Sequence, residues 1–306
     1  MREILSEVPD YPRAGQRAAV LGHPVGHSLS PVLHRAAYAA LGLTGWTYEA
    51  VDVDEPHLER FVAGPPTGWA GWSLTMPLKR AVRPLLVRES DLARDVGAVN
   101  TVLVAPDGLE GYNTDVHGIV EALVERGVPR APAGGAGPGL RATVLGGGAT
   151  AASAVAALRE LGCDDPVVHV RSPLRAEDLV AAAGRLGVRP CLAPFAASDM
   201  IRSVAAADVV ISTLPAGIAD SLVPDGVADA ARARHPVLLD VVYDPWPTTL
   251  ARAWSAAGAP AVGGFVMLVH QAYGQVHLMT GLRPPVEQMR AAGEAALHGR
   301  DLEPAP

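Results

Sequence analysis

The chain has 306 residues, of which 49% are hydrophobic and 19% are charged, a balance typical of a globular protein with a large buried core. The net charge is −7 and no dense block of Lys and Arg appears, which argues against nucleic acid or an anionic membrane surface as a partner. We see no apolar run long enough for a membrane span and no secretory signal. We therefore expect a cytoplasmic protein whose two cysteines, Cys163 and Cys191, are thiols without a metal.

The first part of the chain alternates between strand and helix patterns. Short apolar or alternating runs predict strands over 17–22, 46–53 and 68–77. Helical spacing of apolar residues predicts helices over 32–43 and 56–64, between those strands. Such alternation predicts an α/β fold with a parallel or mostly parallel sheet and helices on its faces.

A second alternating series begins after Asp115. A helix over 118–127 is followed by a Pro- and Gly-rich loop over 128–140 and a strand–turn–helix over 141–162. The last helical pattern ends at Gly281. The remaining predictions are strands over 166–172, 207–215 and 236–245 and a helix over 178–187.

Three glycines, Gly146 to Gly148, directly follow a predicted strand and open a helix. Glycine suits this position because a Cβ would block the tight turn and the close approach of a pyrophosphate, which the helix N-terminus attracts. The full GxGxxG pattern is absent, so a purely structural turn stays open as the alternative. After the next strand, Arg171 and Ser172 stand where NAD sites usually carry an acid, which favours NADP over NAD unless Arg171 is a plain surface residue.

Polar residues gather in four motifs at predicted strand ends. Two hydroxyls two residues apart point to the same side of an extended loop, which suits a carboxylate or a polyol. Taken singly, each motif is also ordinary capping chemistry. The four motifs are HSLSP with Ser28 and Ser30, LTMPLK with Thr75 and Lys79, GAVNT with Asn100, and GYNTD with Asn113, Thr114 and Asp115.

Lys79 and Asp115 form a candidate acid/base pair. The chain contains few lysines, and Lys79 follows an apolar strand and a proline turn. Reduction of a ketone by hydride needs a proton at the oxygen, and a lysine near a carboxylate can deliver it or stabilise the alkoxide charge. Asp115 lies where the two series of elements meet, and such junctions commonly form clefts. No histidine spacing matches a metal site, so we assign none.

Taken in order, the motifs resemble those of the shikimate dehydrogenase family from about Ala18 to about Pro284. They are GHPVGHSLSPVLH, LTMPLK, GAVNTV, GYNTDVHG, the glycine turn, DVVYDPWPTTL and MLVHQA. The resemblance implies two α/β domains, with residues 1–115 and 264–306 binding the substrate and residues 116–263 forming a Rossmann-like NADP domain. It also implies reversible reduction of 3-dehydroshikimate to shikimate in aromatic amino-acid biosynthesis, by a monomer or a homodimer. Quinate/shikimate and aminoshikimate dehydrogenases, and a non-catalytic dinucleotide-binding regulator, stay open as alternatives.

The resemblance also implies roles for individual residues. Lys79 and Asp115 are implied to be the catalytic pair. The glycine turn, GGGATAA, and Val170, where the family commonly has Asn, depart from the family pattern at the cofactor. The implied substrate ligands are Ser28, Ser30, Thr75, Asn100, Tyr243 and Gln271, and the implied cofactor ligands are Gly146, Gly147, Gly148, Ala149, Thr150, Arg171, Ser172, Gly264 and Met267.

Overall fold

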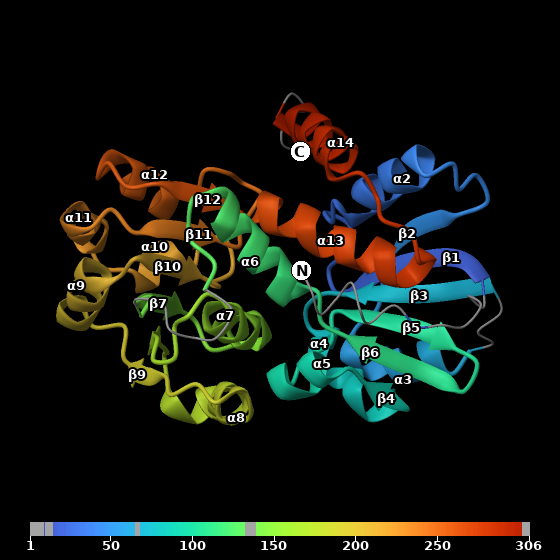
Figure 1. The fold of residues 1–306 in the computed structure, drawn as a ribbon, viewed down its shortest axis with the longest axis horizontal. Helices are drawn as coiled ribbons and strands as arrows, with labels where there is room; N and C mark the ends of the chain where they lie inside the picture. Colours follow the sequence, from blue (N-terminus) through green and yellow to red (C-terminus); the bar gives the residue numbers. More distant parts are fainter. Residues whose placement is uncertain (1–8, 10–14, 65–67, 132–138, 302–306) are drawn as a thin grey trace. The chain divides into compact units, whose positions relative to one another are not determined.

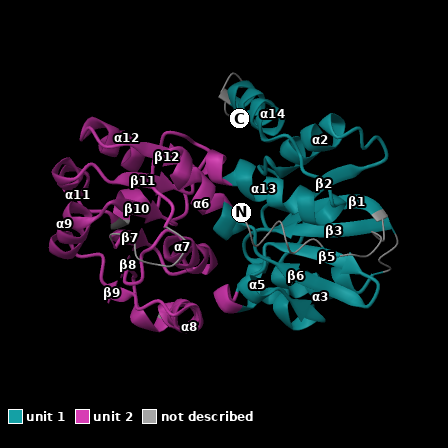
Figure 2. Cartoon of the chain, viewed as in Figure 1, with its two compact units in different colours: residues 1–94, 98–117, 268–306 teal, residues 95–97, 118–267 magenta. Residues whose placement is uncertain are grey.

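The described residues form two compact units, each with its own six-stranded sheet. The computed structural model describes residue 9 and residues 15–64, 68–131 and 139–301 (Figure 1). Most of the Pro- and Gly-rich segment at 128–140 lies outside these residues. Unit 1 consists of residues 1–94, 98–117 and 268–306, and unit 2 consists of residues 95–97 and 118–267 (Figure 2).

The sheet of unit 1 has the strand order β2-β1-β3-β5-β6-β4. Strand β1 pairs in parallel with β2 and β3, and β4 pairs in parallel with β6, whereas β5 is antiparallel to both β3 and β6. Five of the six strands therefore run the same way, and the predicted mostly parallel sheet is confirmed. The strands are β1 (Gly15–Gly22), β2 (Thr47–Asp52), β3 (Gly68–Leu74), β4 (Arg88–Glu89), β5 (Thr101–Ala105) and β6 (Gly108–Tyr112).

The β5–β6 hairpin was not predicted from the sequence. Its strands are joined by the two-residue turn Pro106–Asp107, and Gly108 follows with φ +135°. Glycine supplies this backbone conformation without the steric cost that a side chain would add. The Pro106–Asp107 turn reverses the chain, so that β5 is antiparallel to both of its neighbours in the sheet.

Alternation along β3 directs successive side chains to opposite faces of the unit 1 sheet. Trp72 and Leu74 pack into an apolar cluster with helices α3 (Glu55–Val62), α4 (Leu78–Ala81) and α5 (Asp91–Val96). Ser73, between them, hydrogen-bonds to α13 (Gly264–Thr280) on the other face. On that face α2 (Ser30–Ala40) supplies His34, whose ring stacks on Tyr48 of β2. The short 3-10 helix η1 (Arg83–Leu85) follows α4.

Helix α14 (Val286–Asp301) is a correction to the sequence analysis, which ended the last helical pattern at Gly281. The helix packs against α2 within unit 1. Met289 is a buried apolar side chain of this helix, but most of its other residues are Ala, Gly or charged. The helical spacing of large apolar residues is therefore weak in the sequence. Packing against α2, which the sequence does not display, supports this helix.

The sheet of unit 2 has the order β12-β11-β10-β7-β8-β9, and all its pairs are parallel. Numbered within the unit, this is the order 6-5-4-1-2-3, the arrangement of a Rossmann-type dinucleotide fold. The strands are β7 (Ala142–Leu145), β8 (Val167–His169), β9 (Cys191–Ala193), β10 (Val209–Ser212), β11 (Val237–Asp240) and β12 (Ala261–Gly263). Helix α6 (Asp115–Glu125) begins in unit 1 and continues into unit 2 from Gly118. The other helices of unit 2 are α7 (Ala149–Glu160), η2 (Pro173–Ala176), α8 (Glu177–Leu186), α9 (Ala197–Ala206), α10 (Ala219–Leu222), α11 (Val227–Ala230), η3 (Ala231–Ala233) and α12 (Thr249–Ala256).

Candidate active site

Three elements of unit 1 bring Lys79, Asn100 and Asp115 to one edge of its sheet. Lys79 follows β3, Asn100 precedes β5, and Asp115 follows β6. Because β5 is antiparallel, its first residue lies at the edge where β3 and β6 end. Backbone hydrogen bonds hold this arrangement: the Leu74 N–H donates to the Asn100 carbonyl at 2.8 Å, and the Asn100 N–H donates to the Tyr112 carbonyl at 3.1 Å.

Lys79 and Asp115 form a close ion pair. The Lys79 Nζ donates to Asp115 Oδ2 at 2.5 Å, with 16% of the lysine side chain and 4% of the aspartate side chain exposed. Asp115 is the first residue of α6, where Asn113 Oδ1 accepts from the backbone N–H groups of Asp115 and Val116 at 3.0 and 3.3 Å. Asp115 therefore lies in the first turn of a helix, where an acidic side chain interacts favourably with the helix dipole.

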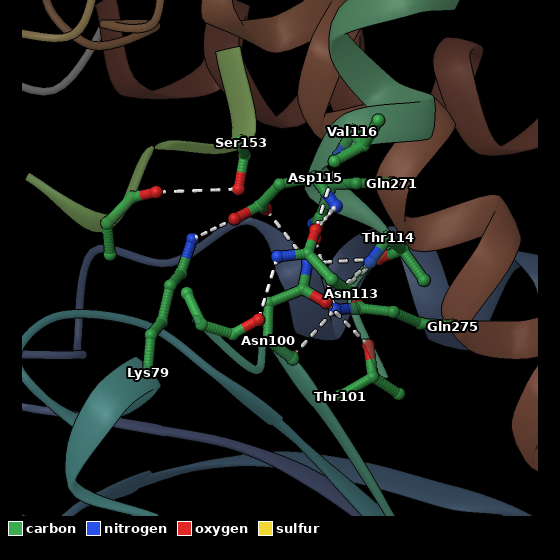
Figure 3. A network of polar contacts seen from close by, with 12 residues as sticks. Lys79, Asn100, Thr101, Asn113, Thr114, Asp115, Val116, Ser153, Gln271 and Gln275 are labelled. Atoms are coloured by element: carbon green, nitrogen blue, oxygen red, sulfur yellow. Dashed lines mark hydrogen bonds and ion pairs between the residues drawn. The ribbon is translucent and has the colours of Figure 1, made fainter. Parts of the chain in front are cut away.

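Two buried amides extend this pair into a network (Figure 3). The Asn100 Nδ2 lies 2.8 Å from Asp115 Oδ1, 2.9 Å from Thr114 Oγ1 and 3.0 Å from Gln271 Oε1. Its Oδ1 accepts from the Thr114 N–H at 2.8 Å and from the Thr101 hydroxyl at 2.9 Å. The predicted residues Lys79, Asn100, Asp115 and Gln271 therefore lie together in unit 1.

Ser28, Ser30 and Thr75 lie on loops and helix ends of the same unit. The Ser30 N–H, at the start of α2, donates to Ser28 Oγ at 3.2 Å, so the Ser28 hydroxyl lies beside the Ser30 backbone. Thr75 directly follows β3, and its methyl group lies so close to Gly22 that a Cβ at Gly22 would collide with it. Glycine at the end of β1 thus gives Thr75 its place beside β1.

Burial controls the ionisation of two rings behind Ser30. Burial lowers the pKa of His34 from its ordinary 6.5 to about 3, although its hydrogen bond to the Ser30 carbonyl opposes the shift. Burial raises the pKa of the Tyr48 phenol, against smaller opposing effects of hydrogen bonds to the Ser73 and Ser30 side chains. Both rings are therefore neutral near pH 7, and Tyr48 acts as a hydroxyl donor.

In unit 2, the glycine turn lies at the carboxyl end of β7 and opens α7. Gly146 has φ +118°, and a Cβ there would overlap the Thr213 hydroxyl, which donates to the Leu145 carbonyl at 2.9 Å. Gly148 is the N-cap of α7, has φ −83°, and would find no atom within 4 Å of an added Cβ. The open backbone at this N-terminus, continued by Ala149 and Thr150, fits a dinucleotide pyrophosphate.

Arg171 and Ser172 follow the neighbouring strand β8. The Gly146 N–H donates to the His169 carbonyl at 2.9 Å, and a Cβ on Gly147 would lie 3.1 Å from Val170 Cγ1. The segment after β8 is thereby held beside the glycine turn. Arg171 is exposed, and its guanidinium is the type of group that binds a phosphate with paired hydrogen bonds.

Tyr243, Gly264 and Met267 follow the last two strands of unit 2. Asp240 accepts from the Thr248 hydroxyl at 2.8 Å and from the Val242 N–H at 3.3 Å, bonds that fix the turn bearing Tyr243. Burial raises the pKa of Asp240. A Cβ on Gly264 would overlap the Val241 carbonyl, so local packing alone already requires glycine there.

Three further observations concern the described residues as a whole. Among them, no helix combines the length and apolar character needed to cross a membrane. In the same part of the chain, no cluster of three or more His, Cys, Asp or Glu side chains is arranged to hold a metal ion. Both cysteines are free, Cys163 buried and Cys191 exposed.

Several residues of the unit 1 network were not predicted from the sequence. Thr101 contacts Asn100, while Ser73 and Gln275 form a buried chain to Gln271. Of these residues, only Gln275 could have been predicted from the sequence. It lies four residues after the candidate Gln271, and residues four apart on a helix share a face. Ser73 could not be found this way, since it lies 202 residues from Gln275 in sequence.

The Rossmann-type strand order of unit 2 and the buried Lys–Asp pair of unit 1 define a dinucleotide-dependent dehydrogenase of the two-unit α/β type. Residues 20–102 match the shikimate dehydrogenase substrate binding domain, and residues 264–292 match the shikimate 5'-dehydrogenase C-terminal domain. The chain belongs to the shikimate dehydrogenase family, whose members are oxidoreductases that act on a CH–OH group. The predicted fold class, enzyme class and family are confirmed.

Individual relatives match over nearly the full chain. The NADP(+) shikimate dehydrogenase of Symbiobacterium thermophilum is 37% identical over 94% of this chain and 96% of its own length. The crystal structure of Mycobacterium tuberculosis shikimate dehydrogenase is 41% identical with a TM-score of 0.80, covering 92% of this chain and 99% of that one. Thermus thermophilus shikimate 5-dehydrogenase, solved in complex with NADP(H) and shikimate, is 34% identical with a TM-score of 0.73 and the same coverage.

Proposed function

We propose that this chain is an NADP-dependent shikimate dehydrogenase that reversibly reduces 3-dehydroshikimate to shikimate in aromatic amino-acid biosynthesis. The observation that carries the proposal is the largely buried contact of 2.5 Å between Lys79 Nζ and Asp115 Oδ2. In the reductive direction the ring carbonyl carbon gains a hydride, and the Lys79 ammonium gives a proton to the carbonyl oxygen. In the oxidative direction the Lys79 amine takes the hydroxyl proton.

The amino-acid choice at position 79 supports a proton-transfer role. Lys79 is the only lysine in the chain, while the other 24 of its 25 basic Lys and Arg residues are arginine. Arginine keeps its proton in proteins, whereas a lysine can release one and take it back. A cation needed for charge alone could have been arginine, as it is everywhere else in this sequence. Asp115 orients the ammonium and balances its charge.

Substrate contacts in the proposal come mainly from unit 1. Ser28 and Ser30 bind the carboxylate through their hydroxyl groups, which can donate to its oxygens, and Tyr243 is a further partner. Hydroxyls of the ring are bound by Thr75, Asn100 and Gln271. The two amides are held in fixed orientations by their buried hydrogen bonds, which reduces the entropy lost on binding.

The proposed NADP site lies in unit 2. When bound, NADPH supplies the hydride. Backbone N–H groups from Gly146 to Thr150 hold the pyrophosphate, Arg171 and Ser172 bind the adenosine phosphate, and Gly264 and Met267 border the nicotinamide. In this assignment residues 1–115 and 264–306 form the substrate domain and residues 116–263 the NADP domain. The proposal places the enzyme in the cytoplasm, supported by two cysteines that form no disulfide.

The test is a steady-state assay at 340 nm with shikimate and quinate, each with NADP and NAD. We expect the highest kcat/KM for shikimate with NADP, and a kcat about 10²- to 10⁴-fold lower in Lys79→Ala. Arg60→Ala, which removes an exposed cation from α3, is the matched control and should behave as wild type. A Lys79→Ala kcat within a few-fold of wild type contradicts the role of Lys79. Binding of NADP without turnover of either polyol would instead identify a dinucleotide-binding regulator.

A further inference from the structure

A buried chain of polar side chains lies behind Gln271 in unit 1. The Tyr48 hydroxyl donates to Ser73 Oγ at 2.6 Å, and the Ser73 hydroxyl donates to Gln275 Oε1 at 2.9 Å. Gln275 Nε2 then donates to Gln271 Oε1 at 3.0 Å and to the Asn100 carbonyl at 3.2 Å. Tyr48, Ser73 and Gln275 are at most 3% exposed, so water cannot replace these bonds.

Backbone groups fix the orientation of two amides in this chain. The Asn100 carbonyl can only accept, so the end of Gln275 that faces it must be Nε2. The Thr114 N–H can only donate, so the end of Asn100 that faces it must be Oδ1. Neither amide can be turned over without placing two donors or two acceptors against each other in a buried site.

The orientation of Gln271 follows from those two amides. Gln275 Nε2 has two hydrogens and two acceptors, so it gives one hydrogen to Gln271. Asn100 Nδ2 also faces Gln271 Oε1, but three acceptors share its two hydrogens. Gln275 is therefore the donor that always has a hydrogen for Gln271 Oε1, and this bond keeps Oε1 pointing toward Gln275. The Gln271 Nε2 is left as the end directed away from the two donors.

We propose that Gln275 is a positioning residue that holds the Gln271 amide with Nε2 toward the substrate, so that this site takes a hydrogen-bond acceptor such as a ring hydroxyl oxygen. Ser73 and Tyr48 support Gln275 from behind, and the hydrogen bonds of Gln275 among the described residues go to Ser73, Gln271 and the Asn100 carbonyl. The inference rests on the proposed function, since it assigns a polarity to the substrate site of that enzyme. Loss of Gln275 lets the Gln271 amide turn over, which weakens substrate binding and leaves the proton-transfer pair intact.

The experiment compares Gln275→Met, which has a similar length and no polar group, with the wild type. We expect the KM for shikimate to rise about five- to tenfold, with kcat and the KM for NADP within about twofold of wild type. Ser73→Ala leaves Gln275 bonded to the Asn100 carbonyl, so its KM for shikimate should rise less, by about two- to threefold. Gln288→Met, at an exposed position of α14, is the matched control and should match wild type.

The outcomes separate positioning from plain structural support. A residue that only supports the fold lowers kcat with the folded fraction and leaves the KM for shikimate unchanged, and that result overturns the proposal. If Gln275→Met does not fold, Ser73→Ala decides, and an unchanged KM for shikimate in that variant also overturns it. Absence of shikimate turnover by the wild-type enzyme is a failure of the proposed function, distinct from either result.

Discussion

The two units prepare their sites in opposite ways. Unit 1 fills its sheet edge with buried side chains whose hydrogen bonds fix one another, from Tyr48 through Gln275 and Asn100 to the Lys79–Asp115 pair. Unit 2 instead omits side chains: Gly146 has a backbone that disfavours a Cβ, and the space over Gly148 is open. Ring substituents need directional donors and acceptors, whereas a pyrophosphate is bound by backbone N–H groups that a side chain would cover.

The comparison predicts two kinds of failure. A substitution in the unit 1 network should change rates and substrate affinity by removing a charge or a donor. In the unit 2 turn, an added methyl group should act by occupying space. Where that space is filled by other protein atoms, the methyl group should lower the stability of the fold.

After substitutions of Lys79 itself, Asp115→Asn should give the largest effect. The change keeps the shape of the side chain but removes the negative charge beside the Lys79 ammonium, so kcat should fall about 10²- to 10³-fold. The measurement is shikimate oxidation at saturating NADP. Asp107→Asn, at the exposed turn of the β5–β6 hairpin, is the control and should keep the wild-type kcat. Equal rates for the two variants would remove Asp115 from the mechanism.

Lowering the pH should reduce the folding stability of unit 1 because of His34. Folded His34 stays neutral because its pKa is lowered to about 3, whereas the unfolded chain binds a proton below about 6.5. The unfolded state thus gains protons as the pH falls from 6.5 to 3, and stability decreases by up to about 1.4 kcal/mol per pH unit. Urea titrations at pH 6.5 and pH 4.5 should show a smaller loss in His34→Phe, which retains a ring against Tyr48. An identical loss in both proteins would refute this assignment.

Gly146→Ala should destabilise unit 2 and weaken NADP binding together. Its φ of +118° and the overlap with the Thr213 hydroxyl should cost about 1–3 kcal/mol, measurable as a lower melting temperature. Gly148→Ala is the matched variant, since its backbone is allowed and its new methyl meets no protein atom. It should melt like wild type but bind NADP more weakly. A Gly148→Ala variant with wild-type NADP affinity would place the pyrophosphate elsewhere.

Arg171→Ala should have the smallest effect of these substitutions, and the effect should be limited to the KM for NADP. Removing the guanidinium should raise the KM for NADP about tenfold, the value of one charge-assisted hydrogen bond, and leave the KM for NAD unchanged. Arg189→Ala, an exposed arginine of the same unit, serves as the control. If the KM values for both dinucleotides rise equally, Arg171 does not bind the 2′-phosphate.

Local patterns explain which parts of the molecule were predictable. The strands β1 to β3, the glycine turn and α7 follow from apolar periods and glycine placement, which act over a few residues. The β5–β6 hairpin was missed because no element was predicted between residues 77 and 118, yet it is this hairpin that places Asn100 beside Asp115. Lys79 and Asp115 could be chosen from residue chemistry. Gln275 could have been chosen from its spacing of four residues from Gln271. Ser73 could not, because its partners Tyr48 and Gln275 come from distant elements.

The most direct test of the central claim, that Lys79 transfers the proton, is the kcat of Lys79→Arg. Arginine preserves the positive charge opposite Asp115 but cannot release its proton, so we predict a loss of about 10²-fold or more, comparable to that of Lys79→Ala. Calorimetric titration with shikimate shows whether the variant still binds the substrate. A Lys79→Arg enzyme that binds shikimate and keeps kcat within about tenfold of wild type would contradict the account and leave Lys79 a purely electrostatic role.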